Sequence, residues 1–190
     1  MIEEEKLKNI RAKKMMLWFS MISMTMTFAG LTSAYVVSSS RQDWLNNFDL
    51  PFEFTISTIL IFLSSITIHI SKRSLLNGNF NFQNYFLWMT IILAFTFLYS
   101  QFKGFSSIIQ QGYYFTGAES SITTSFLYVL VVLHMLHFIG GLIVLFIISN
   151  NSYKKIYNKS NTIGFELATI FWHFLGFLWI YLYVFVVAYN

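Results

Sequence analysis

The chain has 190 residues, of which 56% are apolar, 20% are aromatic and only 11% are charged. An ordinary soluble domain carries about 25% charged residues. A soluble chain of this size also has too little interior to bury 22 Phe, 11 Tyr and 5 Trp side chains. The composition therefore excludes an ordinary soluble domain and indicates a protein whose surface is largely covered by lipid.

The chain contains no cysteine. Disulfides, zinc–thiolate sites, iron–sulfur clusters and a catalytic cysteine are therefore excluded. The net charge of +4 does not indicate nucleic-acid binding, because the basic residues form short clusters between apolar runs.

Five apolar segments follow one another along the chain. Their approximate bounds are 15–37, 52–70, 85–102, 122–148 and 163–189. At about 1.5 Å per residue, each segment can cross a hydrocarbon core of about 30 Å as a helix. Helices are expected because backbone polar groups in lipid must be hydrogen-bonded internally. With short connections between the segments, the sequence predicts one all-α membrane domain, a bundle of five transmembrane helices over residues 1–190.

The basic residues predict the orientation of this bundle. Most of the 12 Lys and Arg residues lie before the first segment, between the second and third, or between the fourth and fifth, namely Lys6, Lys8, Arg11, Lys13, Lys14, Lys72, Arg73, Lys154, Lys155 and Lys159. Arg41 and Lys103 lie on the other side. Because basic residues favour cytoplasmic loops, we expect a cytoplasmic N-terminus and a periplasmic C-terminus.

Small residues recur on two of the segments. Gly30, Ala34 and Ser38 are four positions apart on the first segment, and Gly140 and Gly141 interrupt the fourth. Small side chains let helix backbones approach closely in a membrane. We therefore predict close helix packing at these positions.

Ionisable residues within the apolar segments are candidates for function, because they are costly to place in lipid. His134 and His137 lie three positions apart on the fourth segment and so share a helix face. His173 on the fifth segment lies at about the same depth as His137. Glu166 is two turns before His173 on the same face, about one turn inside its helix.

Three interpretations remain open from these residues alone. His137 and His173 could ligate a haem, as in a small b-type cytochrome or a quinone-linked membrane protein. Glu166 with the histidines could instead form a transport or proton-relay site. In the third interpretation these groups, together with Trp172 and Trp179, form ordinary polar contacts between helices or with lipid head groups.

Motifs in all five segments resemble cytochrome oxidase subunit III. The last segment carries the most extended match, Glu166, then Trp172-His173-Phe174, then Trp179. Shorter matches occur in the family's order in the other four, namely Phe28–Leu31 with Ala34-Tyr35, Ser57-Thr58 with Ser64-Ser65, Leu87-Trp88-x-Thr90 with Gln101, and Ser125-Phe126 with His134-x-x-His137 and Gly140. The chain is similar to the short, five-helix bacterial form of this family.

The resemblance implies an accessory, non-catalytic subunit of a proton-pumping haem–copper terminal oxidase, multi-pass in the bacterial inner membrane. It implies no haem, copper or other metal on this chain, since the redox centres of the family lie in subunits I and II. The implied partners are those two subunits, phospholipids and other respiratory complexes, and the implied roles are to stabilise subunit I, to hold phospholipid and to assist proton uptake. The implied lipid-binding or structural cleft comprises His134, His137, Glu166, Trp172, His173 and Trp179.

Three positions depart from the family's pattern. Met24, Gly104 and Gly176 stand where the family usually has carboxylates, so that Glu166 alone remains. The resemblance therefore implies a structural and lipid-binding role for this chain rather than a proton antenna built from buried carboxylates.

Overall fold

The computed structural model describes residues 2–41, 44–45, 50–115, 121–157 and 161–189. These residues form five helices, α1 (Ile2–Ser38), α2 (Phe52–Asn77), α3 (Phe80–Gln110), α4 (Ile122–Tyr153) and α5 (Ile163–Ala188). All five are long and apolar enough to cross a membrane. The predicted all-α class with five membrane-spanning helices is confirmed.

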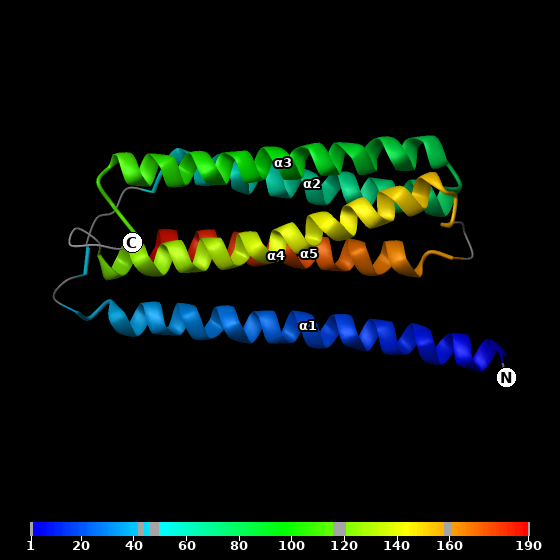
Figure 1. The fold of residues 1–190 in the computed structure, drawn as a ribbon, viewed down its shortest axis with the longest axis horizontal. Helices are drawn as coiled ribbons and strands as arrows, with labels where there is room; N and C mark the ends of the chain where they lie inside the picture. The colour runs from blue at the N-terminus through cyan, green and yellow to red at the C-terminus, as the bar shows by residue number, and fades with distance from the viewer. Residues whose placement is uncertain (1, 42–43, 46–49, 116–120, 158–160, 190) are drawn as a thin grey trace.

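The helices run up and down, so that their ends fall into two groups (Figure 1). The start of α1, the turn between α2 and α3 and the end of α4 lie at one end of the bundle, and the C-terminus lies at the other. The predicted basic clusters thus gather at a single end, apart from Lys159, which lies outside the described residues. The side of the membrane on which this end lies stays a prediction.

α1 begins much earlier than the apolar segment that predicts it. Its first turn carries Glu3, Glu4 and Glu5, whose negative charges are stabilised by the positive N-terminal end of the helix dipole. Lys8 and Glu4, one turn apart, form an ion pair of 3.3 Å that also stabilises this part of the helix. Hydropathy detects only the lipid-covered part of a helix, whereas backbone hydrogen bonding continues into the polar sequence.

α2 and α3 form a tight hairpin. α2 ends at Gly78, whose φ of 84° is the left-handed conformation that glycine adopts without strain, and the Gly78 N–H donates to the Leu75 carbonyl. Further along the pair, the Gln101 amide donates to Ser57 Oγ at 2.8 Å, and the hydroxyls of Thr67 and Thr90 are 2.8 Å apart. These contacts join the middle parts of the two helices, and α3 itself begins five residues before and ends eight residues after the predicted segment 85–102.

α1 lies at the edge of the bundle. Among the described residues it packs against α4 and α5 and against no other helix, and Figure 1 shows it running beside them, away from α2 and α3. Its buried side chains include Phe28 and Tyr35. The main core lies between the other four helices, around Phe97, Phe138 and Trp172.

Candidate functional site

A row of hydroxyl groups on α2 meets the polar groups of α5. The indole N–H of Trp179 donates to Thr58 Oγ1 at 3.1 Å. The indole N–H of Trp172 donates to Ser64 Oγ, also at 3.1 Å. Because α2 and α5 are antiparallel, the later tryptophan of α5 meets the earlier hydroxyl of α2, and the earlier tryptophan meets the later hydroxyl. The sequence singled out both tryptophans but predicted neither partner.

Both tryptophans belong to the packed interior. Trp172 is 1% exposed and Trp179 is 2% exposed. Trp179 stacks on Phe54 of α2, and Trp172 lies 5.0 Å from the ring of Phe138 on α4. A buried N–H in lipid needs a partner within the protein, and the α2 hydroxyls supply it. The two indoles therefore connect α5 to α2 and α4.

His134 is fully buried in a box of aromatic rings. The rings of Phe28, Phe97, Phe138 and Trp179 lie 5.2–6.4 Å from it, centroid to centroid. Neither of its ring nitrogens has a hydrogen-bond partner among the described residues. Because a charged ring would be desolvated here without compensation, His134 fills space as a neutral aromatic side chain.

His137 and His173 face different helices. The His137 Nδ1–H donates to the Leu133 carbonyl at 2.8 Å, and its ring contacts Phe28 of α1. His173 of α5 instead faces α2, where its Nδ1 is 3.2 Å from Ser65 Oγ and its ring lies 6.2 Å from that of His69. A shared haem iron requires two imidazoles that converge on one metal. The described contacts do not favour that arrangement.

The side chains also offer no cluster of metal ligands. In the part of the chain that the structure describes, no group of three or more His, Cys, Asp or Glu side chains could hold a metal ion. His69 and His173 form a pair of neighbouring imidazoles, with Ser65 beside them. Two imidazoles and a hydroxyl are fewer ligands than a closed structural or open catalytic zinc site uses.

Glu166 lies in the first turn of α5, at the depth that the sequence predicts. Its carboxylate is 3.4 Å from the ammonium of Lys14 on α1, and both side chains are partly exposed. This ion pair joins the first helix to the last. Sequence reasoning missed it, although Lys14 closes the basic cluster of α1 and Glu166 is the single carboxylate of the last segment.

Two of the glycines that depart from the family's carboxylate pattern lie close to side chains of α2. A Cβ added at Gly104 would lie 3.0 Å from the Phe54 ring, and one at Gly176 would lie 3.3 Å from Ser65 Oγ. Any side chain at these two positions would have to displace its neighbour by a few tenths of an ångström. α2 approaches α3 and α5 closely as a result.

Of the glycines predicted to pack closely, Gly141 does so, whereas the prediction is wrong for Gly30 and Gly140. A Cβ at Gly141 would lie 2.6 Å from Leu175 Cδ1 of α5, which confirms close packing there. A Cβ at Gly30 or at Gly140 would meet no atom within 4 Å. α1 therefore has an open face around Gly30, whereas Ala34 and Ser38 are half-buried.

Comparison with known proteins identifies the family. Residues 15–190 match the family model of cytochrome c oxidase subunit III. The chain is 28% identical to cytochrome c oxidase subunit 3 of Thermostichus vulcanus over 167 residues, which cover 86% of this chain and 80% of the relative. It is 27% identical to cytochrome bo(3) ubiquinol oxidase subunit 3 of Buchnera aphidicola, covering 96% of this chain and 94% of the relative. A mammalian relative, cytochrome c oxidase subunit 3 of Rattus norvegicus, is 32% identical over 74% of this chain and 50% of its own length. The match extends from the end of the basic cluster through all five helices, and the chain belongs to the cytochrome c oxidase subunit III family.

Proposed function

We propose that the chain is a non-redox accessory subunit of a proton-pumping haem–copper terminal oxidase and that it stabilises subunit I. The family match over residues 15–190 is the observation that carries this proposal. The packing supports it, because Trp172, Trp179 and His173 are engaged in contacts between helices. Haem and copper then belong to subunits I and II, and oxygen is reduced there.

The open face of α1 is the surface proposed to contact subunit I. Gly30 is exposed, and Ala34 and Ser38 follow it at intervals of one turn. A partner helix can approach a row of small residues closely, which is how helices associate when the hydrophobic effect no longer discriminates between protein and lipid. α4 and α5 cover the face of α1 that carries Phe28 and Tyr35, which leaves Gly30 exposed and Ala34 and Ser38 half-buried.

The six residues singled out from the sequence divide into two proposed roles. Trp172, Trp179 and His134 are buried and hold the helices in register. The partly exposed His137, His173 and Glu166 are available to phospholipid at the surface of the bundle.

We place the complex in the bacterial inner membrane, with other respiratory complexes as further partners. The names of the relatives include both cytochrome c and ubiquinol oxidases, so the electron donor is not part of the proposal.

Co-purification tests the proposed function. The full chain, affinity-tagged and expressed in its own host, should recover a haem-bearing subunit I, and deletion of the chain should reduce the recovery or lifetime of active oxidase. Replacement of Gly30 by Leu should weaken the association, whereas replacement of Gly140 by Leu on α4 serves as the matched control. Recovery of the chain as a stable monomer, while oxidase assembles normally without it, would contradict the proposal.

An absorption spectrum of the isolated chain tests the cytochrome interpretation. A stoichiometric Soret band that disappears on replacement of His137 or His173 would favour that interpretation instead.

A further inference from the structure

Two histidines from distant parts of the sequence meet where α2 packs against α5. The ring centres of His69 on α2 and His173 on α5 are 6.2 Å apart. His69 is exposed and His173 is half-buried, so the pair lies at the surface of the bundle rather than in its core. The roles proposed above give His69 no part, and an imidazole within a membrane-spanning helix is a candidate for function.

Ser65 orients the ring of His173. The Nδ1 of His173 is 3.2 Å from Ser65 Oγ, and Ser65 lies one turn before His69 on α2. When the Nδ1–H donates to this hydroxyl, the lone pair is on Nε2, which is the state in which an imidazole binds a metal. No hydrogen bond ties His69 to the residues that the structure describes. Its ring can therefore turn to share a ligand with His173.

The separation of the two rings selects the kind of metal ion. With a metal–nitrogen bond of about 2 Å, each ring centre lies about 3 Å from the metal. Ring centres 6.2 Å apart therefore flank a metal nearly in line, whereas a tetrahedral zinc ion would draw them to about 5 Å. Two-coordinate binding in line is typical of copper(I) and of its analogue silver(I), and imidazole is a ligand that suits copper.

The surroundings of the pair also favour an ion of single charge. Lys72 follows His69 by one turn on α2, and its positive charge acts on His173. The repulsion between this ammonium group and a bound cation is about twice as large for a divalent ion as for a monovalent one. The cost of removing an ion from water rises with the square of its charge. A divalent ion is therefore disfavoured on both counts.

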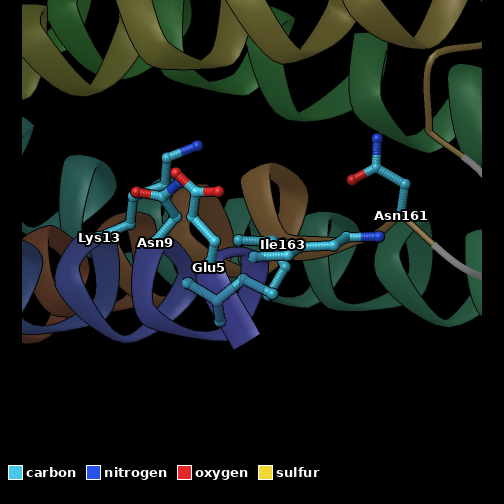
Figure 2. Close-up of a pocket in the computed structure, with 7 residues that line it drawn as sticks. Glu5, Asn9, Lys13, Asn161 and Ile163 are labelled. Atoms are coloured by element: carbon cyan, nitrogen blue, oxygen red, sulfur yellow. The ribbon is translucent and has the colours of Figure 1, made fainter. Parts of the chain in front are cut away.

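The polar cavity at the basic end of the bundle does not compete for such an ion. This cavity of about 380 Å³ lies between the start of α1 and the beginning of α5, and Figure 2 shows Glu5 and Asn9 beside Lys13. Lys6 lines it as well. Two ammonium groups against one carboxylate repel cations, and the described lining of the cavity includes no imidazole.

We propose that His69 and His173 bind one copper(I) ion, held in line between their two rings at the surface where α2 meets α5. Ser65 is the positioning residue of the site, because it holds the His173 ring. The inference goes beyond the proposed function and does not depend on it, since the ion keeps its single charge and takes no part in oxygen reduction. It departs from the family resemblance, which implies no metal on this chain.

Silver(I) binding to the full chain in detergent tests the proposal, because silver(I) has the same charge and coordination preference as copper(I) and is stable in air. The chain carries no cysteine that could compete, and it is purified without a polyhistidine tag. In a calorimetric titration, His69→Gln should weaken the strongest site about tenfold or more, since one of two ligands is lost. His137→Gln removes an imidazole elsewhere and should leave the affinity unchanged. Unchanged affinity in His69→Gln, or an equal loss in His137→Gln, would overturn the proposal.

Two further variants test the geometry around the ligands. Ser65→Ala keeps both imidazoles but releases the His173 ring, and it should weaken silver(I) binding about 10–100-fold, as is typical when a group that orients a metal-binding histidine is lost. Lys72→Gln removes the repelling charge and should strengthen binding about twofold or more. Weaker binding in Lys72→Gln would contradict the proposed charge preference.

X-ray absorption by the copper(I)-loaded chain, prepared with ascorbate and without oxygen, identifies the ligands. Two nitrogen neighbours and no sulfur are expected. Sulfur neighbours would show that methionines bind the ion instead. Displacement of silver(I) by equimolar zinc, in a manner that depends on His69, would show a divalent site. Either of these two results would overturn the proposal.

Discussion

Trp172 and Ser64 lie 108 positions apart in the sequence and meet across α5 and α2, where the indole N–H donates to the serine hydroxyl at 3.1 Å. The Ser64 hydroxyl in turn donates to the Ile61 carbonyl of its own helix at 2.8 Å. Both side chains are buried. The bond therefore ties the last helix to the second at a point that neither water nor lipid reaches.

Removal of this bond should weaken the bundle. We expect Trp172→Phe and Ser64→Ala to lower the free energy of unfolding, with a coupling between the two changes of about 0.6 kcal/mol, the average for polar contacts between membrane helices. The measurement is a double-mutant cycle on reversible unfolding in mixed micelles. Trp88→Phe is the control, because the Trp88 indole bonds to Tyr153 at an exposed position. Strictly additive effects of the two core changes would contradict this prediction.

Two adjacent glycines on α4 should respond oppositely to added bulk. Gly141→Leu should cost about 1–3 kcal/mol, typical of overpacking, because Leu175 and Trp172 already occupy the space beside Gly141. Gly140→Leu should be neutral or slightly stabilising within this chain, because no atom lies within 4 Å of its added Cβ and leucine favours helices. Thermal stability of the two variants in detergent compares them directly. Similar losses at both positions would show that α4 is packed differently.

The ion pair between Lys14 and Glu166 should matter for assembly more than for proton pumping. Because both side chains are partly exposed, we expect Glu166→Gln to cost about 1 kcal/mol or less and to loosen α1 from α5. The chain has no cysteine, so cysteines introduced in place of Leu17 and Leu167 give a clean distance or cross-linking report on that seam.

In the same Glu166→Gln oxidase, initial oxygen reduction and the number of protons pumped per electron should remain nearly unchanged, while long-term activity declines. Lys14→Glu combined with Glu166→Lys restores the opposite charges and should recover the cross-linking yield. An immediate fall in pumping stoichiometry with normal assembly would place this carboxylate in the proton path.

The orientation predicted from the basic residues can be measured with topology reporters. Fusions should alternate between periplasmic and cytoplasmic, starting with periplasmic, at positions in or next to the four connections and after the last helix, namely Trp44, Asn77, Gln111, Asn151 and Tyr189. The physical reason is the cytoplasmic retention of Lys and Arg near helix ends. A uniformly inverted pattern would leave the helix assignment intact and contradict the orientation, whereas a broken alternation would contradict the number of spans.

Composition and hydropathy were sufficient for the number and type of the elements. In lipid, the backbone polar groups of a single segment must be hydrogen-bonded within that segment, which a helix achieves. An apolar run such as 122–148 is therefore expected to be helical whatever its neighbours are. The depth of Glu166 and the shared face of His134 and His137 follow from the regular rise and turn of a helix. The family could be recognised for the same reason, since its motifs are short and lie within single helices.

The partners of these side chains were decided only by the tertiary structure. Depth alone paired His137 with His173, whereas the rotation of each helix about its axis turns His137 toward α1 and His173 toward Ser65 and His69 of α2. Likewise, hydropathy starts the first membrane segment near Met15 and so puts Lys14 at its beginning, but only the packing of α1 against α5 brings Lys14 to Glu166. The rotation of a helix and its position beside other helices depend on the packing of side chains from distant segments, as at Gly141 against Leu175. The sequence of one helix alone therefore does not determine them.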